Sequence, residues 1–315
     1  MALKVAIQMD PIEKVDVHAD TTFDFALEAA ARGAEIWVYG PDELSLASGR
    51  PVARAQKIER IERVDSNAVD LGPATEIALE AVNVVLVRQD PPFNMAYITA
   101  AQILEFLPPE VLVLNDPRSI RDAPEKLFVA QFQDLTPPTL ITRDPLAINA
   151  FRAEHGDIIV KPLYGNGGAG VFKMAADDGN FNSLVEMFLE NYPEPSIFQK
   201  FIPAVSAGDK RIILIDGQAV GAINRVPAAG ETRSNMHVGG RAEAVEMSAR
   251  DQEICDRIGP TLSERGLIFV GIDVIGDYLT EINVTSPTGV QEVRRFGGAD
   301  ISALLWDWVE GRLES

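Results

Sequence analysis

Cysteine and histidine are scarce in this sequence. Its 315 residues include one cysteine, Cys255, and three histidines, His18, His155 and His237. A single cysteine excludes an internal disulfide, and its place in an amphipathic helical pattern predicts a buried, unreactive thiol rather than a nucleophile. The three histidines are scattered and lack the spacing of a zinc site. The composition therefore argues against thiol nucleophiles and zinc chemistry.

Positive charge and long apolar runs are also lacking. The chain has 28 Lys and Arg against 47 Asp and Glu, a formal net charge of −19. This balance argues against nucleic acid or an anionic membrane as a partner, so an anionic substrate would need a local group of basic residues. No run approaches the roughly 18 apolar residues of a membrane span, and residues 4–9 predict a strand rather than a signal-peptide core. We expect a cytoplasmic location.

Strands and helices alternate in the first third of the chain. We predict strands at 3–9, 35–39, 83–87 and 111–114, with helices at 21–32 and 95–107. This alternation is typical of an open, mostly parallel sheet, whose ligands lie beyond the carboxyl ends of its strands. The chain is long enough for two or three packed units, and a change to turn residues and charge predicts a boundary near Arg121.

Arg88 and Asp90 stand at the end of the predicted strand 83–87. Pro91 and Pro92 follow and would hold the turn rigid. A fixed arginine suits a carboxylate of a substrate. The alternative is a surface salt bridge beside a stiff turn.

A lysine precedes a glycine-rich reversal in residues 157–172. Ile158 to Val160 predict a buried strand that ends at Lys161, and residues 171–174 predict its returning partner. The glycines between them permit backbone N–H groups to close over an anion. The lysine comes before the glycines and a strand comes after them, which argues against a P-loop and a dinucleotide motif. The alternative is an ordinary glycine-rich hairpin.

The remaining two-thirds of the chain mixes short strands and helices. We predict a helix from Lys126 to about Gln133 and a last helix at 301–313 with Leu304, Leu305, Trp308 and Val309 on its core side. The other predicted elements are strands at 139–141, 196–203, 209–215, 219–225, 269–275 and 279–287, and helices at 145–154, 182–191 and 248–265.

Residues 226–241 form a long segment with little apolar content. Loops of this length in a compact enzyme are usually lids or disordered segments. Arg225, Arg233 and Arg241 would bring positive charge to whatever a lid covers. A plain disordered insertion is the alternative.

Three oxygen-bearing side chains interrupt the last two predicted strands. Asp273 lies in an apolar strand, and Glu281 and Asn283 alternate along the next one, on the same side as Leu279. Buried carboxylates are costly unless a cation neutralises them, and such ligands suit Mg²⁺ shared with phosphates. An ion pair with a neighbouring arginine is the alternative. Together with two lysines, the group predicts a nucleotide-triphosphate site.

The chain resembles ATP-grasp ligases, and closely the bacterial glutathione synthetases, over nearly its full length. The most diagnostic segments are residues 88–93 and 280–288. The resemblance also includes residues 125–128, 161–163, 208–211, 230–233 and 266–271. Tyr164 departs from the pattern, since a small or acidic residue is expected there.

The resemblance implies an α/β and α+β fold in three parts. These are an N-terminal domain with an open parallel sheet (1–121), a small ATP-grasp lobe (122–200) and a C-terminal lobe (201–315) with a lid at 226–241, the two lobes clasping ATP. It also implies a homotetramer.

The resemblance further assigns roles to individual residues. The implied ATP ligands are Lys126, Lys161, Gly165, Gly167, Gly168, Gln199, Lys200, Phe201, Ile202 and Asp209. The implied ligands of Mg²⁺ or Mn²⁺ are Asp273, Glu281 and Asn283. The implied catalytic residues are Lys161, Arg211, Arg225 and Arg233. The implied substrate ligands are Arg88, Asp90, Arg233, Asn283, Thr285 and Ser286.

The implied reaction joins γ-glutamylcysteine to glycine, the last step of glutathione biosynthesis. The γ-phosphate of ATP passes to the cysteinyl carboxylate, and the amine of glycine then displaces phosphate to give glutathione and ADP. One alternative keeps the fold but changes the acceptor, as in a ligase for D-alanine or for glutamate on a protein tail. Another is a nucleotide-binding regulator without turnover.

Overall fold

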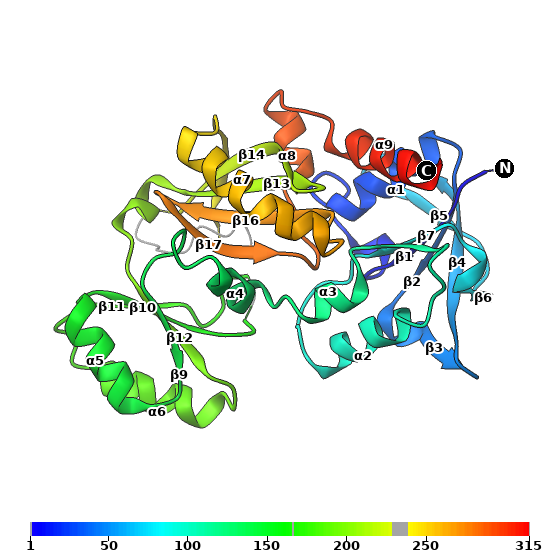
Figure 1. Cartoon of the computed structure of the whole chain (residues 1–315). Helices are drawn as coiled ribbons and strands as arrows, with labels where there is room; N and C mark the ends of the chain where they lie inside the picture. Colours follow the sequence, from blue (N-terminus) through cyan, green and yellow to red (C-terminus); the bar gives the residue numbers. More distant parts are fainter. Residues whose placement is uncertain (1, 166, 229–238, 315) are drawn as a thin grey trace.

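The computed structural model of the chain describes residues 2–165, 167–228 and 239–314. They form three sheets. In Figure 1 the N-terminal sheet lies on the right, the sheet of residues 209–283 lies near the centre, and the sheet of residues 139–200 lies at the lower left. No helix in the described residues is long and apolar enough to cross a membrane.

The N-terminal sheet is parallel from β2 to its edge at β8 and antiparallel on the other side. Its order is β3-β4-β2-β1-β7-β8, with β5 and β6 also paired to β4. Strands β1, β2, β7 and β8 run parallel, whereas β4 is antiparallel to β2. The strands are β1 (Lys4–Gln8), β2 (Glu35–Tyr39), β3 (Leu44–Ala47), β4 (Arg50–Ile61), β5 (Val69–Leu71), β6 (Thr75–Ala78), β7 (Val84–Val87) and β8 (Leu112–Leu114). The sequence predicted the parallel strands but none of β3 to β6.

Three helices accompany this sheet: α1 (Thr21–Ala31), α2 (Met95–Leu104) and α3 (Pro117–Arg121). Asp20 caps α1, because its carboxylate accepts a hydrogen bond of 2.6 Å from the backbone N–H of Phe23. The predicted start of this helix at residue 21 is therefore confirmed.

The second sheet belongs to the small lobe, which has a core of its own. The order β11-β10-β12-β9 is antiparallel throughout, and the predicted pairing of the glycine-loop strands, β10 with β11, is confirmed. Two helices pack on it through buried Ile148, Phe181 and Phe188. The elements are β9 (Thr139–Thr142), α5 (Pro145–His155), β10 (Ile158–Pro162), β11 (Phe172–Met174), α6 (Phe181–Asn191) and β12 (Ser196–Lys200).

The third sheet has the order β15-β14-β13-β16-β17 and is antiparallel. Its β13 and β14, both predicted as strands, pair as a hairpin, and Cys255 is buried in α7 at 1% exposure, as predicted. The elements are α4 (Glu125–Phe128), β13 (Asp209–Ile215), β14 (Gln218–Val226), β15 (Arg241–Ala244), α7 (Ala249–Glu264), β16 (Phe269–Ile275), β17 (Tyr278–Asn283), α8 (Val290–Arg295) and α9 (Ile301–Glu314).

The helix predicted from Lys126 to Gln133 is wrong in its length. Helix α4 ends at Phe128 and gives way to a 3₁₀ turn at Val129–Gln131. Beyond this turn, the carbonyl of Leu135 accepts a hydrogen bond of 2.9 Å from the backbone N–H of Leu279. The chain leaves the helix because its backbone is bonded to β17 instead.

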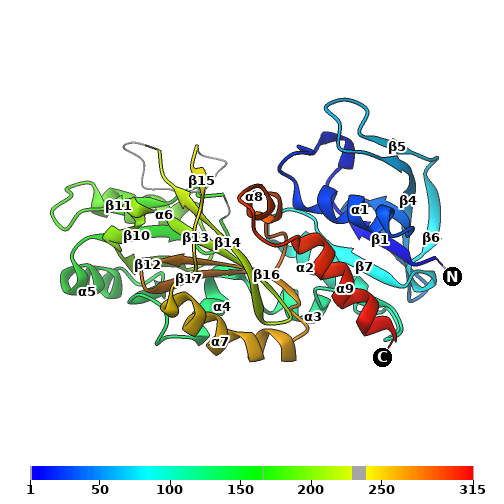
Figure 2. The same cartoon turned by 90° about the horizontal axis from the view of Figure 1, so that it is seen from above.

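The core-facing side of α9 was predicted correctly except at Leu304. Leu304 is 39% exposed, whereas Trp306 is fully buried and donates a hydrogen bond of 2.9 Å to the carbonyl of Phe25. Figure 2 shows α9 running along α1, and the two helices are in contact. The buried side of α9 therefore includes Trp306 in place of Leu304. Leu305 and Val309 are buried as predicted.

Asn115 joins the N-terminal sheet to the third sheet. Its Nδ2 donates hydrogen bonds of 2.8 Å to the carbonyls of Phe269 and Val284, and its Oδ1 accepts one of 2.8 Å from the backbone N–H of Phe269. The side chain is 4% exposed. One buried carboxamide thus fixes the start of β16 and the end of β17 against β8.

Candidate active site

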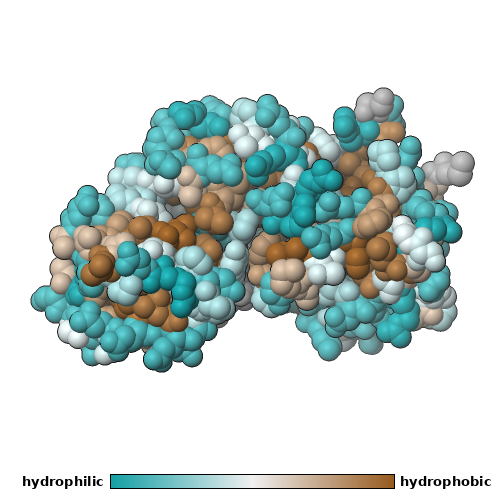
Figure 3. Space-filling model, turned by 60° about the horizontal axis from the view of Figure 1, so that its bottom comes forward, coloured by the Kyte–Doolittle hydropathy of each residue, from teal (hydrophilic) through white to brown (hydrophobic). Residues whose placement is uncertain are grey.

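A cleft lies between the small lobe and the third sheet. Strands β10 and β12 and the glycine-rich loop form one side, and β16 and β17 form the other. In Figure 3 the surface is also indented between the lobe at the lower left and the N-terminal domain at the right. The residues that the resemblance implies as ATP ligands all line the cleft: Lys126, Lys161, Gly165, Gly167, Gly168, Gln199, Lys200, Phe201, Ile202 and Asp209.

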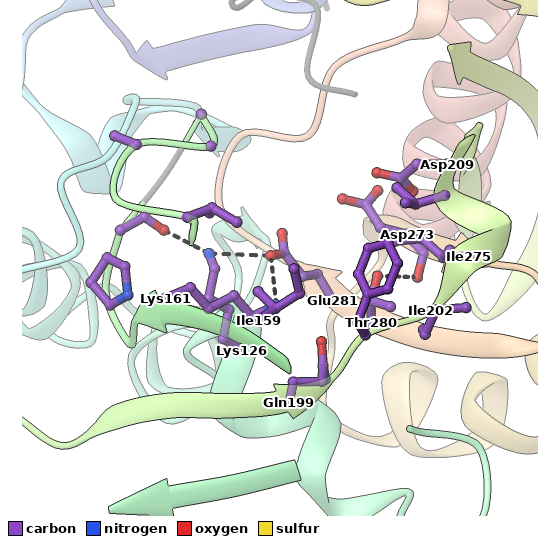
Figure 4. A pocket seen from close by; sticks show the side chains of 18 of the residues that line it. Lys126, Ile159, Lys161, Gln199, Ile202, Asp209, Asp273, Ile275, Thr280 and Glu281 are labelled. Carbon is purple, nitrogen blue, oxygen red and sulfur yellow. Dashed lines mark hydrogen bonds and ion pairs between the residues drawn. The ribbon is translucent and has the colours of Figure 1, made fainter. Parts of the chain in front are cut away.

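Two lysines meet one glutamate in this cleft, although they come from separate elements. The Nζ atoms of Lys126 in α4 and Lys161 in β10 lie 3.4 and 3.6 Å from Oε1 of Glu281 in β17. Burial alone would raise the pKa of Glu281, but the two ammonium groups bring it below its usual value. Figure 4 shows these ion pairs within the cleft. Two ammonium groups thus meet at one carboxylate in the cleft, and ammonium groups are cations that can bind a phosphate.

The lysines themselves differ. Burial lowers the pKa of Lys161, while the pKa of Lys126 is raised, because Glu281 and Glu125 offset its burial. Lys126 also donates a hydrogen bond of 2.6 Å to the carbonyl of Gly165. Sequence reasoning did not single out Glu125, which is bonded to Lys126 and whose pKa is raised by burial.

Asp273 is held by two arginines. Its Oδ1 accepts from Nε of Arg211 at 2.5 Å, and its Oδ2 accepts from Nη2 of Arg211 at 3.1 Å and lies 3.0 Å from Nη2 of Arg225. Arg225 also bonds Asp209 at 2.6 Å. Burial would raise the pKa of Asp273, but the two guanidinium groups hold it well below its usual range. Asp273 therefore forms ion pairs with two neighbouring arginines, and its role as a metal ligand stays a prediction.

The predicted side of β17 is wrong for Leu279. Asp273 lies opposite Glu281, but the register shifts after Asp273, so that Val274 lies opposite Leu279. This bulge turns Leu279 to the apolar side, where it packs with Ile272 and Ile282. Residues opposite each other in antiparallel strands share a side, so Glu281 faces the cleft with Asp273.

The donor set fits a hard divalent cation. Asn283 lies opposite Gly271, on the same side as Asp273 and Glu281, so three oxygen-bearing side chains share one face. Nδ2 of Asn283 is buried and has no hydrogen-bond partner among the described residues. Within the same residues, no three His, Cys, Asp or Glu side chains are grouped to hold a metal by themselves. A metal here would therefore need the Asn283 oxygen and phosphate oxygens as further ligands.

The glycine-rich loop needs its glycines for two reasons. Gly167, Gly168 and Gly170 have φ of +61°, +79° and +71°, which side chains rarely adopt. At Gly165 the reason is space, because a Cβ there would lie 2.6 Å from Cγ of Pro162. The loop can thus bring its backbone close to Lys126 and Lys161.

The far end of the cleft is apolar. Ile159, Val171, Val205 and Ile275 line it, and Gln199 is fixed by a hydrogen bond of 2.8 Å from its Nε2 to Oγ1 of Thr139. An apolar floor beside the segment 199–202 suits a flat ring such as adenine. Sequence reasoning missed the four apolar residues, because an apolar side chain that lines a cleft cannot be distinguished by sequence from an ordinary core residue.

Arg88 is buried outside the cleft, with 5% exposure, so a surface salt bridge is excluded for it. Its Nε and Nη2 donate to Oγ1 of Thr22 and the carbonyl of Pro287, both at 3.0 Å. The guanidinium lies over Phe25 and Phe269 at 5.5 and 5.4 Å from the ring centroids. Nη1 has no partner among the described residues, and burial lowers the pKa of the group.

The other predicted substrate ligands lie around Arg88 or outside the described residues. Ser286 donates a hydrogen bond of 3.2 Å to the carbonyl of Arg88, and Thr285 precedes it. Asp90 is exposed, and its backbone N–H donates to Asp10 at 2.9 Å. Arg233 and the middle of the predicted lid lie outside the described residues.

Comparison of the sequence with protein families gives two matches that together span most of the chain. The description "Prokaryotic glutathione synthetase, N-terminal domain" matches residues 3–121, and "Prokaryotic glutathione synthetase, ATP-grasp domain" matches residues 125–298. The chain is 58% identical to a glutathione synthetase of Mesorhizobium japonicum over 312 residues, covering 99% of both chains. It is 43% identical to that of Salmonella typhimurium over 313 residues, again covering 99% of each.

Solved structures support the fold. The ATP-grasp ligase PsnB in complex with a minimal precursor has a TM-score of 0.63 at 21% identity and covers 98% of this chain and 99% of its own. The D-cycloserine synthetase DcsG has a TM-score of 0.67 at 12% identity, with coverage of 98% and 99%. At such identities these similarities concern the ATP-grasp fold alone. The family matches and the full-length relatives show that the chain belongs to the prokaryotic glutathione synthetase family.

Proposed function

We propose that this chain catalyses the ATP-dependent ligation of γ-glutamylcysteine and glycine, giving glutathione, ADP and phosphate. The observation that carries the proposal is the meeting of Lys126, Lys161 and Glu281 in the cleft, at the distances given above. Two ammonium groups facing an acidic strand surface form a site for a polyphosphate and its metal. The family membership then selects the substrates.

In the proposed reaction, the two lysines bind the phosphates of ATP and offset the charge that develops as the γ-phosphoryl group moves to the cysteinyl carboxylate. The amine of glycine attacks the resulting acyl phosphate, a C–N bond forms, and the C–O bond to phosphate breaks. Arg211 and Arg225 both contact Asp273, which faces the cleft. We propose that they stabilise the oxyanion that forms when the amine attacks the acyl phosphate. We also propose a role for Arg233.

We propose Asp273, Glu281 and Asn283 as ligands of Mg²⁺ or Mn²⁺. A divalent cation would supply electrostatic stabilisation of the transferring phosphoryl group. The chain's own contribution is to hold three oxygen donors on one side of β16 and β17.

We propose that Arg88 binds a carboxylate of the γ-glutamyl dipeptide. A buried guanidinium with one unpartnered nitrogen and no carboxylate within 4.0 Å among the described residues favours an anionic ligand. Asp90, Thr285, Ser286 and Asn283 would complete the substrate site. This requirement favours an anionic peptide over the zwitterion D-alanine.

We further propose the division into residues 1–121, 122–200 and 201–315 as substrate domain, small lobe and C-terminal lobe. By family likeness we propose a homotetramer, which light scattering would measure as four times the mass of one chain. We propose a cytoplasmic location, because the reaction uses ATP and a thiol dipeptide.

The test is release of ADP, measured with each substrate omitted in turn. We expect release only when ATP, a divalent cation, γ-glutamylcysteine and glycine are all present, with glutathione formed in equal amount. Release that is equal with D-alanine, or that occurs with a glutamate-tailed peptide instead, would replace the proposal by one of the alternative ligases. ATP binding without ADP release would favour the regulatory alternative.

A further inference from the structure

A small cavity lies where the N-terminal domain, the small lobe and the third sheet meet. Its volume is about 20 Å³. Its walls come from the segment after β7, the start of α4, the glycine-rich loop and the segment after β17. The wall residues that matter here are Pro91, Phe93, Glu125, Leu163, Tyr164 and Thr285.

The cavity lies between Arg88, the proposed anchor of the dipeptide, and Lys126, a proposed ligand of the ATP phosphates. On one side, the segment that carries Thr285 is tied to Arg88, through Ser286 at 3.2 Å and the carbonyl of Pro287 at 3.0 Å. On the other side, Lys126 is bonded to Glu125 and to the carbonyl of Gly165, which also lines the cavity. A dipeptide held at Arg88 and phosphorylated beside Lys126 therefore passes this cavity.

The walls are mostly apolar. The rings of Phe93 and Tyr164 stack with their centroids 6.1 Å apart at 27°, and Leu163 is 5% exposed. None of the wall residues is a lysine or an arginine, so the walls offer no cation. The one carboxylate among them, on Glu125, is paired with Lys126. The zwitterion glycine needs a cation for its carboxylate, which argues against this cavity as the glycine site.

The size and chemistry fit one neutral group. A volume of about 20 Å³ holds about one water-sized group. Sulfur makes favourable contacts with aromatic rings. Resting on the proposed function, we propose that this cavity binds the thiol-bearing side chain of γ-glutamylcysteine, and that Phe93 and Tyr164 set the size of side chain that the enzyme accepts.

The proposal predicts the order of kcat/KM values for different γ-glutamyl dipeptides. The side chain of α-aminobutyrate ends in a methyl group in place of the thiol and fits the cavity, so this dipeptide is used nearly as well as the cysteine one. The glycine dipeptide leaves the cavity unfilled and loses roughly 10-fold in kcat/KM, the usual effect of an empty apolar subsite. The leucine dipeptide is too large and is rejected.

The experiment measures kcat/KM for these four dipeptides at saturating ATP and glycine. It compares the wild type with Phe93→Ala, Tyr164→Ala and Tyr164→Phe, and uses Phe106→Ala as the control, since Phe106 is 57% exposed and outside the cavity walls. We expect both alanine variants to reduce the preference for cysteine over leucine by at least about 10-fold. Tyr164→Phe keeps the ring and should keep the preference, as should the control.

Two results would overturn the proposal. If the alanine variants change the KM for glycine and leave the ranking of dipeptides intact, the cavity serves the amine acceptor. If they lower all four values by one factor, the rings only pack the loop. Tyr164 is 37% exposed, so its variants keep the test valid if Phe93→Ala does not fold. Failure of the proposed function is distinct, since the wild type would then release no ADP with γ-glutamylcysteine and glycine.

Discussion

The cleft and the N-terminal domain treat buried charge in opposite ways. In the cleft, Glu281 has two lysines within 4 Å, and Asp273 has two arginines within hydrogen-bond distance. Arg88 is as deeply buried, yet its contacts among the described residues are neutral: a hydroxyl, a carbonyl and two aromatic rings.

In the cleft, the buried charges are neutralised by other protein groups. At Arg88, the positive charge has no protein counter-charge in contact and is available to a ligand. Paired buried charges depend on each other, so removal of one partner is costly. A cation buried among neutral groups loses its hydration when the protein folds. A carboxylate that binds later therefore forms an ion pair with it at no further desolvation cost for the cation. Substitutions in the two regions should therefore change stability in opposite directions.

The largest effect is expected for Asp273→Ala. It leaves Arg211 buried without its carboxylate, and loss of one member of such a pair costs about 3–5 kcal/mol. Urea unfolding followed by circular dichroism measures this loss, with Asp277→Ala at an exposed position as the control. A loss below about 1 kcal/mol would show that the pair is not the structural unit described above.

Lys161→Met should act on turnover instead. Glu281 keeps Lys126 as a partner at 3.4 Å, so folding should change little. Loss of one group that stabilises a transferring phosphoryl lowers kcat by about 10²–10³-fold. Steady-state ADP release measures the effect, and Lys57→Met, in a partly exposed pair with Glu35, is the control. Equal losses in both variants would contradict a specific role for Lys161.

Arg88→Met tests the other half of the comparison. Replacing an uncompensated buried charge by an apolar side chain should leave stability unchanged or raise it. The KM for γ-glutamylcysteine should rise by about 10–100-fold, because a hydrogen bond to a charged group contributes about 1.5–3 kcal/mol. The KM for ATP should not change. Arg54→Met, which is paired at the surface with Glu43, is the control. Strong destabilisation by Arg88→Met would mean that the guanidinium is structural.

The smallest effect concerns Cys255, a buried group without charge. Burial raises its pKa to about 12, so the thiol stays protonated at neutral pH and up to about pH 10. A thiol reagent should label the folded protein no faster at pH 9 than at pH 7 and should label it fully in urea. Rapid labelling of the folded protein at pH 7 would contradict the buried position of Cys255.

The sequence was informative where chemistry interrupts a pattern. Lys161 at the end of an apolar strand and Asp273 within one stand out, because buried charge is rare without a reason. The opposite case is the apolar floor of the cleft. Ile159 and Ile275 cannot be distinguished from core residues until the fold shows that they line an open space.

The fold was harder to predict where side chains are small or the backbone is irregular. Strand β4 turns Ala53 and Ala55 inward, and alanine is a weak strand former between charged residues. The bulge in β17 has no side-chain signature, so the alternation rule placed Leu279 on the wrong side. The aromatic setting of Arg88 joins Phe25 to Phe269, which only the tertiary structure brings together.

Asn115 has a consequence for how a nucleotide enters. Because its carboxamide locks β8 to β16 and β17, the N-terminal domain and the third sheet form a single rigid base. Among the residues that the structure describes, strands β9 to β12 pair only with one another. A swing of residues 139–200 about their two connecting segments would therefore open the cleft and move Leu163 and Tyr164 in the cavity wall, while Arg88 stays with the rigid base.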